Sequence, residues 1–216
     1  MIACTTSLLC TVPAQAMPGE KTILVVGDSL SAEYGIARNQ GWVARLQKTL
    51  DEKAPGHKLV NASISGDTTS GGMSRLPAAL EQHQPAYVII ELGGNDALRG
   101  LPLTMTQSNL TRMTEMAQAK GAKVLLAGMQ IPPNYGKEYA EAFRSLFPTV
   151  ASQTNSDLIP FFLEGVAQSM DLFQSDGIHP NEQAQPIMAA TVWKHLEPML
   201  NTTQASKSIS SRPSQP

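Results

Sequence analysis

Cysteine is almost absent from this chain of 216 residues, and the two that occur, Cys4 and Cys10, both lie near its start. The remaining sequence therefore has no thiol that could form a disulfide, serve as a nucleophile or bind a metal. This excludes a small scaffold held together by disulfides. Stability has to come from a packed core, and a chain of this length with 42% hydrophobic residues is large enough to form one.

Three further features are missing. The 16 Lys and Arg residues do not form a basic stripe, so we expect no nucleic-acid partner. Beyond residue 16, no apolar run approaches the roughly 20 residues that span a bilayer, so we expect no stable membrane insertion. None of the four histidines has another His or a Cys at the spacing of metal ligands. We therefore predict neither a metal nor another cofactor.

Residues 1–16 have the pattern of an export signal. An apolar stretch at 2–12 precedes Pro13 and the small-x-small sequence Ala14-Gln15-Ala16, which is typical of a cleavage site. Cleavage after Ala16 implies a periplasmic or secreted protein. The usual positively charged start is missing, so we interpret the segment as a truncated signal peptide. The alternative is a cytoplasmic protein with a leader that does not function.

Short apolar runs alternate with segments of helical periodicity. The runs are rich in Val, Ile and Leu and predict buried strands at 22–26, 58–61, 87–92, 123–127 and 158–160. Between and after them, helices are predicted around 42–50, 73–80, 110–116, 139–153 and 183–200. This alternation predicts an α/β fold, a three-layer α/β/α doubly wound (flavodoxin-like) arrangement around a central, mainly parallel five-stranded sheet.

The domain boundaries follow from the same reading. We expect one domain at 17–200 behind the leader at 1–16. Residues 201–216 are mostly Ser, Thr, Gln and Pro, which predicts a disordered polar tail. The favoured oligomeric state is a monomer.

Ser29 follows the first predicted strand, in the sequence Gly27-Asp28-Ser29. A serine hydroxyl becomes a good nucleophile when a histidine takes its proton and a carboxylate orients that histidine. Asp176 and His179 supply both groups in a loop before the last helix, so we predict that these three residues form a catalytic triad. The alternatives are that Ser29 caps a helix and that His179 lies in an ordinary surface turn.

Acyl transfer also needs hydrogen-bond donors aimed at the oxygen that becomes negative. Two segments that follow predicted strands are candidates, residues 63–67 with Gly66 and residues 93–96 with Asn95. Each sequence is also compatible with an ordinary turn.

Together these segments resemble the SGNH or GDSL hydrolase family. The resemblance rests on Gly-Asp-Ser-Leu-Ser at 27–31, Gly-Asp-Thr-Thr-Ser-Gly-Gly at 66–72, Glu-Leu-Gly-Gly-Asn-Asp at 91–96 and Asp-Gly-Ile-His-Pro-Asn at 176–181. It implies a serine hydrolase that cleaves carboxylic esters and acyl thioesters through an acyl-enzyme intermediate. The most similar members are bacterial thioesterases, lysophospholipases and arylesterases, which implies aryl esters, acyl-CoA and lysophospholipids as substrates. The implied oxyanion hole consists of the N–H groups of Ser29 and Gly66 and the side chain of Asn95.

Apolar residues near the predicted site are candidates for contact with the acyl chain. They are Leu98, Leu101, Ile131, Pro132 and Ile178. The resemblance implies that the loop after Asn95 contacts the acyl chain. An equally weighted alternative is that the two leucines close the end of the sheet and that Pro132 stiffens a turn.

Two other functions stay open at this point. A carbohydrate O-acetylesterase would use the same chemistry with a short polar pocket. A non-catalytic module would bind a small anion or nucleotide at the loop 27–29. The chain lacks a glycine-rich phosphate-binding pattern, however, and Asp28 would repel an anion there.

Overall fold

A computed structural model describes residues 19–210, with side chains throughout except at 133 and 202–210. The predicted leader lies outside the described residues. Five strands form one parallel sheet in the order β2-β1-β3-β4-β5. Their bounds are β1 Lys21–Gly27, β2 His57–Asn61, β3 Tyr87–Glu91, β4 Lys123–Ala127 and β5 Asp157–Ile159. The five-stranded sheet is confirmed, and each predicted strand agrees with the observed one to within a residue at either end.

The central strands are buried on both faces. In β1, Ile23 to Val26 are fully buried, and Val25 pairs with Asn61 of β2 on one side and with Ile89 of β3 on the other. Helices cover both faces of the sheet, so successive side chains of a strand all point into apolar surroundings. Burial on both faces explains why these strands are continuous apolar runs in the sequence, with no alternation of apolar and polar residues.

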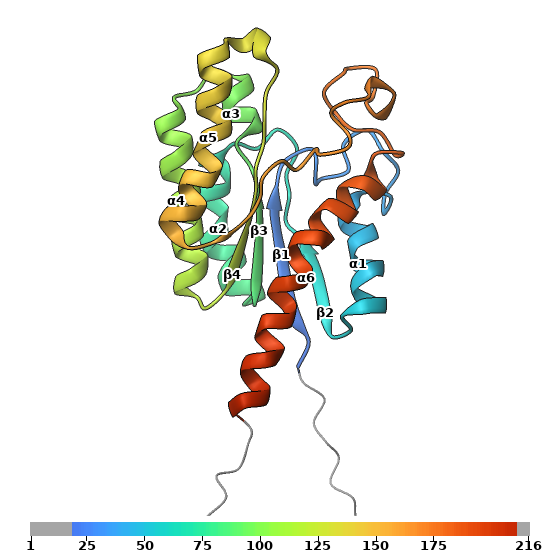
Figure 1. The fold of residues 1–216 in the computed structure, drawn as a ribbon, viewed down its shortest axis with the longest axis vertical. Helices are drawn as coiled ribbons and strands as arrows, with labels where there is room; N and C mark the ends of the chain where they lie inside the picture. Colours follow the sequence, from blue (N-terminus) through green and yellow to red (C-terminus); the bar gives the residue numbers. More distant parts are fainter. Residues whose placement is uncertain (1–18, 211–216) are drawn as a thin grey trace, which may run out of the picture.

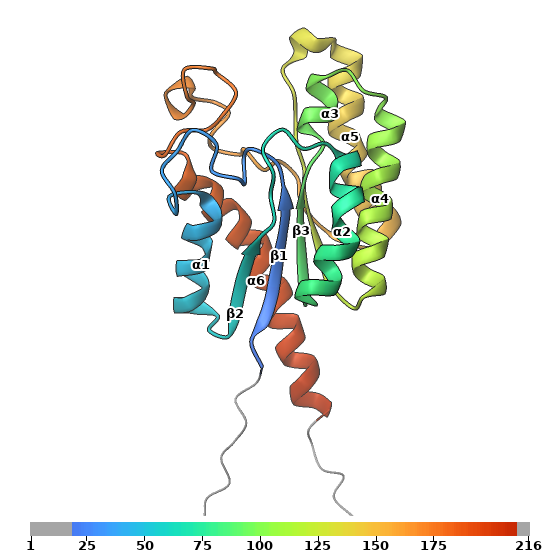
Figure 2. The same cartoon turned by 180° about the vertical axis from the view of Figure 1, so that it is seen from behind.

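The helices form the two outer layers (Figure 1, Figure 2). One face of the sheet carries α1 and α6, which pack against each other, and the other carries α2, α4 and α5. The helices are α1 Trp42–Lys53, α2 Thr69–His83, α3 Gly94–Leu98, α4 Leu103–Ala119, α5 Lys137–Thr154 and α6 Gln185–Ser210, with 3-10 turns η1 Pro133–Tyr135 and η2 Met170–Leu172. The predicted three-layer fold is confirmed. Among the described residues, no helix is both long and apolar enough to cross a membrane.

The last helix is longer than the sequence predicted. It continues to Ser210, whereas the sequence predicted a helix that ends at 200 and a disordered polar tail from 201; residues 211–216 lie outside the described part. The stretch 201–210 contains no proline or glycine, so no strong helix breaker follows the buried residues Val192, Leu196 and Leu200. The low apolar content that favoured disorder does not by itself end a helix.

The order in which the chain adds strands to the sheet switches from one side of β1 to the other. It passes first to β2 on one side, returns to β3 on the other, and then continues outward through β4 to β5. Because all strands are parallel, their carboxyl ends lie at one edge of the sheet, the upper edge in Figure 1. In sheets of this kind, ligand sites form at that edge beside the switch point.

Candidate active site

Ser29 lies just beyond the carboxyl end of β1, at the switch point of the sheet. The backbone turns sharply after Gly27, where the N–H groups of Ser31 and Ala32 donate to the carbonyl of Asp28 over 3.2 and 2.9 Å. A Cβ on Gly27 would lie 2.7 Å from the Ser31 hydroxyl oxygen and from a carboxylate oxygen of Glu91. This close packing explains why glycine precedes the turn, and the turn leaves the Ser29 side chain facing a cavity.

The predicted triad residues are in hydrogen-bond contact. Nε2 of His179 lies 2.9 Å from Oγ of Ser29, and Nδ1 of His179 lies 2.7 Å from Oδ2 of Asp176. The other carboxylate oxygen of Asp176 accepts the backbone N–H groups of Ile178 and His179, each over 2.9 Å. One turn of the loop therefore fixes both the carboxylate and the imidazole.

These contacts determine which ring nitrogen of His179 carries the proton. The hydrogen bonds from the backbone N–H groups of His179 and Ile178 and from the imidazole lower the pKa of Asp176 to about 2. An ionised carboxylate only accepts hydrogen bonds, so Nδ1 of a neutral His179 carries the proton. Nε2 is then left as the acceptor for the hydroxyl proton of Ser29, which is the arrangement that activates a serine.

Tyr34 and Gln174 complete the surroundings of the histidine, and the sequence analysis missed both. The ring of Tyr34 lies against the imidazole, with the centroids 4.3 Å apart and the planes inclined by 37°. The Gln174 amide donates to the Tyr34 carbonyl over 2.8 Å, while its backbone N–H donates to the carbonyl of His179 over 2.7 Å. An aromatic residue five positions after Ser29 was a visible signal, but its spacing carries no information about a partner so distant in sequence.

The loop between β2 and α2 brings Gly66 to the site. The loop is held to the end of β1 by a hydrogen bond of 3.1 Å from the Ile64 N–H to the Gly27 carbonyl. Arg75 adds a second link, because it binds Asp67 over 2.7 Å and the Gly27 carbonyl over 3.1 Å. Gly66 has a φ of +78°, which favours glycine at this position. Within residues 19–210, the N–H groups of Ser29 and Gly66 have no protein acceptor.

Asn95 reaches the site from α3, a short helix where the sequence analysis expected a turn or a site loop. Its side-chain nitrogen donates to a carboxylate oxygen of Asp28 over 3.0 Å, which uses one of its two N–H groups. The next residue, Asp96, is fully buried and accepts hydrogen bonds from the Thr69 N–H over 2.9 Å and from the Thr106 hydroxyl over 3.3 Å. These bonds tie α3 to the starts of α2 and α4, so Asn95 is held in a fixed position.

Two buried acids lie beneath the Ser29 turn. Glu91, at the end of β3, is fully buried and accepts the backbone N–H of Asp28 over 3.2 Å and the hydroxyl of Ser31 over 2.7 Å. Burial and the neighbouring charge of Asp28 raise the pKa of Glu91 well above its usual value. Burial also raises the pKa of Asp28 to about 6, although the hydrogen bonds from Leu30 and Asn95 lower it in part.

A cavity of about 720 Å³ opens at Ser29 and Asn95. Four of the five predicted acyl-contact residues line it, namely Leu98, Ile131, Pro132 and Ile178. Further apolar lining residues were missed by the sequence analysis, because they follow β4 and β5 without any motif; they are Met129, Phe161, Leu163, Met170 and Phe173. The described residues contain no group of three His, Cys, Asp or Glu side chains that could hold a metal ion.

Leu101 is not among the residues that line this cavity. After α3 the chain turns back at Gly100, which has a φ of +66°, and the Leu101 N–H donates to the Asp96 carbonyl over 2.9 Å. The carbonyl of Leu101 then accepts the hydroxyl of Tyr139 over 3.1 Å. Of the two leucines predicted as cavity residues, only Leu98 therefore contributes to the wall.

Residues 25–186 match the GDSL-like Lipase/Acylhydrolase family. The chain is 53% identical over 180 residues to "Esterase TesA" of Pseudomonas aeruginosa, an alignment that covers 83% of this chain and 90% of that protein. It is 44% identical over 180 residues to "Thioesterase 1/protease 1/lysophospholipase L1" of Escherichia coli strain K12, with 83% of this chain and 85% of that protein covered. A crystal structure of TesA is similar with a TM-score of 0.81 at 53% identity, covering 82% of this chain and 99% of that one.

The buried carboxyl group of Asp28 predicts a pH-dependent loss of stability. Its pKa of about 6 lies above the ordinary 3.8, so the folded state holds the proton more tightly than the unfolded state. This contribution to stability is complete below pH 4 and is lost as the pH rises through 6. Asp28→Asn has no carboxyl group to titrate and lacks this pH dependence. As the pH is raised from 4 to 7, the free energy of unfolding of the variant should therefore increase relative to that of the parent, by up to about 3 kcal/mol. Urea unfolding at both pH values measures the difference.

Asp51→Asn is the matched control, because Asp51 is an exposed carboxylate on α1. Its stability relative to the parent should change little over the same pH range. A difference between Asp28→Asn and the parent that stays constant from pH 4 to pH 7 would contradict the assignment of a raised pKa to Asp28.

Proposed function

This chain belongs to the GDSL-like Lipase/Acylhydrolase family and hydrolyses esters and thioesters, and from that premise we propose that Ser29, His179 and Asp176 carry out the reaction. One observation carries the proposal. The hydroxyl of Ser29 lies 2.9 Å from a histidine nitrogen whose partner nitrogen is bound by an ionised carboxylate, and the same hydroxyl faces an apolar cavity. Nucleophile, base and orienting acid therefore meet at a place where an acyl chain can bind.

In the first stage, Oγ of Ser29 attacks the carbonyl carbon of the substrate while its proton passes to Nε2 of His179. Asp176 stabilises the imidazolium that forms. The tetrahedral intermediate then collapses, as the bond from the carbonyl carbon to the leaving oxygen or sulfur breaks and His179 gives that atom its proton. The acyl group remains bonded to Ser29.

In the second stage, a water molecule gives a proton to His179 and attacks the acyl-enzyme, after which the carboxylic acid leaves and Ser29 regains its proton. In both stages the negative oxygen needs donors in place before it forms. We propose the N–H groups of Ser29 and Gly66 and the second N–H of the Asn95 amide for this role. The bond from Asn95 to Asp28 supports it, since that bond orients the amide before the substrate arrives.

The shape and lining of the cavity bear on the substrate. A cavity of about 720 Å³ with walls of Leu98, Ile131 and Phe161 suits an aliphatic or aromatic acyl group better than an acetyl group. We therefore favour aryl esters, acyl thioesters and lysophospholipids as substrates, and a carbohydrate O-acetylesterase becomes the less favoured alternative. A non-catalytic module is ruled out by the family, whose relatives are named for hydrolytic activities.

We also propose that the enzyme acts as a monomer outside the cytoplasm. Every residue of the proposed site comes from one chain, so the reaction needs no partner subunit. Export rests on the small-x-small pattern at 14–16 in the sequence, which lies outside the described residues.

Replacement of the nucleophile gives the direct test of the mechanism. Ser29→Ala should lower kcat for nitrophenyl esters by at least about 10³-fold with little change in folding, because only a small side chain is removed. A fluorophosphonate probe should label the parent at Ser29 and leave the variant unlabelled. Ser74→Ala, which alters an exposed serine on α2, is the control and should keep both properties. Equal labelling of all three proteins would show that another residue is the nucleophile.

A series of nitrophenyl esters and matched thioesters tests the substrate class. Each methylene that enters the cavity should raise kcat/KM by about 4-fold until the cavity is filled, since a buried methylene contributes about 0.8 kcal/mol. Ile131→Ala should reduce the ratio of octanoate to acetate activity, whereas Leu101→Ala, outside the cavity, should not. An enzyme that cleaves acetate well and octanoate hardly at all is the result that would favour the acetylesterase.

The mass of the protein in cell fractions tests the proposed export. Cleavage after Ala16 predicts a chain that begins at Met17 in the periplasmic fraction or the medium. An intact chain found only in the cytoplasm would instead support the leader without function.

A further inference from the structure

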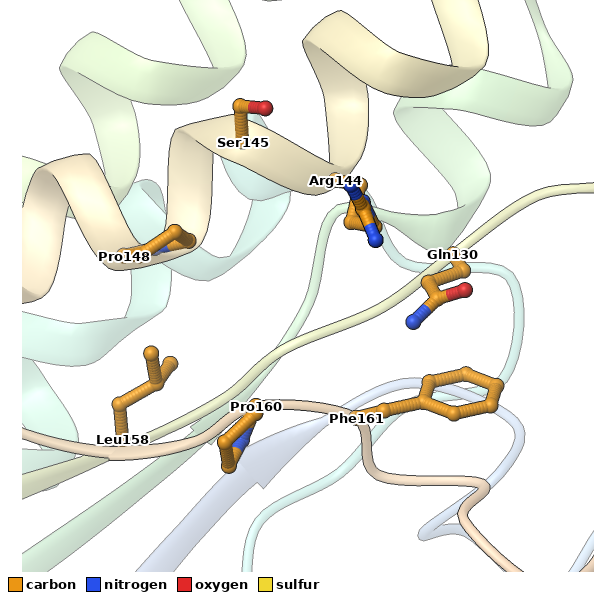
Figure 3. Close-up of a pocket in the computed structure, with 7 residues that line it drawn as sticks. All are labelled: Gln130, Arg144, Ser145, Pro148, Leu158, Pro160 and Phe161. Carbon is orange, nitrogen blue, oxygen red and sulfur yellow. The ribbon is translucent and has the colours of Figure 1, made fainter.

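A second hollow, of about 280 Å³, lies between α5 and the end of β5. It shares two lining residues, Gln130 and Phe161, with the cavity that opens at Ser29. The two spaces are therefore adjacent at these two side chains. Figure 3 shows the smaller hollow, with Arg144 extending from α5 toward Gln130 and with Phe161 across from them.

Two polar side chains of this hollow, those of Arg144 and Gln130, have N–H donors that no other described side chain or backbone group engages. Within residues 19–210, neither the guanidinium of Arg144 nor the side-chain amide of Gln130 takes part in a hydrogen bond or an ion pair. The other walls are mostly apolar, with Pro148, Leu158 and Pro160 among them. Arg144 and Gln130 are themselves exposed, so an anion that enters the hollow can reach the guanidinium from solvent.

The charges along the path from one space to the other have opposite signs. Asp28 and Asp176 lie beside Ser29 and disfavour a second negative group close to the reacting carbonyl. Arg144 lines the smaller hollow together with Gln130 and Phe161, and there a negative group would meet up to five N–H donors arranged in a fork. This arrangement of charges favours a substrate whose anionic group is remote from its scissile bond over one whose anionic group is next to it.

We propose that Arg144, assisted by Gln130, forms an anion subsite for esters and thioesters that carry a carboxylate or phosphate remote from the scissile carbonyl. This inference rests on the proposed function, because it assigns a distal group to the substrate bound at Ser29. The anion can come from the acyl group, as a terminal carboxylate, or from the leaving group, as a phosphate. In both cases the same guanidinium binds it through paired hydrogen bonds.

The experiment compares the parent with Arg144→Gln, Arg144→Lys and the control Arg112→Gln, an exposed arginine of α4 that lines neither space. One substrate pair places the charge on the acyl side, as a nitrophenyl octanoate and a nitrophenyl ester of the same length ending in a carboxylate. The second pair places it on the leaving group, as octanoyl-pantetheine and octanoyl-CoA. For each pair, the selectivity is kcat/KM for the charged substrate divided by kcat/KM for the neutral one.

In the substrate pair that uses the subsite, Arg144→Gln should lower the selectivity by about 10-fold, mainly through KM, and added salt should lower it in the parent. Arg144→Lys should fall between the parent and Arg144→Gln, since it keeps the charge and loses the fork. A loss confined to one pair identifies the source of the anion.

Equal selectivity in all four proteins with both substrate pairs would overturn the subsite. Arg112→Gln lowering the selectivity as much as Arg144→Gln would overturn it as well, because a general effect of surface charge would then explain the result. The neutral substrates keep these outcomes separate from the proposed function. If the parent fails to hydrolyse the neutral esters and thioesters, the function itself is wrong, whatever the charged substrates show.

Discussion

The hydrogen bond of 2.9 Å between Ser29 and His179 joins segments that are 150 residues apart in the chain. A bond over this sequence distance exists only because the sheet brings the end of β1 beside the loop that precedes α6. Further long-range bonds hold the two segments together, such as that from the Trp42 N–H to the Gln185 side chain and that from the Ala37 N–H to Glu182. The contact between the two residues is therefore a property of the folded core, and loss of the core packing would separate Ser29, the proposed nucleophile, from His179, its proposed base.

The buried acids at the Ser29 turn, Glu91 and Asp28, lower the stability of the fold in exchange for fixing the site. Removing a carboxyl group from water is unfavourable, and the pKa values of Glu91 and Asp28 rise for this reason. In return, Glu91 holds the Asp28 N–H and the Ser31 hydroxyl, while Asp28 holds Asn95. The acids fix a tight turn and a donor amide at the same time, which is the kind of local cost that accompanies a preorganised site.

The cavity at Ser29 and the hollow beside it bear on how a substrate is bound and oriented. Apolar walls near Ser29 contribute affinity for the substrate but do not fix its orientation, whereas charged groups do. Asp28 and Asp176 lie at the Ser29 site, whereas Arg144 lines the adjacent hollow that shares Phe161 with the cavity, so the charges beside the two spaces have opposite signs. An acyl chain bound by apolar contacts alone can shift along the cavity. A substrate that also carries a distal anion is held at one position relative to Ser29.

The sequence by itself determined the strands, the layers and the identity of the residues that meet at the site. Buried strands are apolar throughout because they lie between two helical layers. The motif residues at 27–31, 66–72 and 91–96 lie where a strand ends or a helix begins, and those at 176–181 lie in the loop before α6. The stacking of Tyr34 on His179, the bond between Asp28 and Asn95, the exclusion of Leu101 from the cavity and the length of α6 were decided only in the tertiary structure. Periodicity and motif spacing report on neighbours within one element, whereas each of the first three features depends on how separate elements pack. The fourth depends on a polar stretch in which the composition permits both helix and coil.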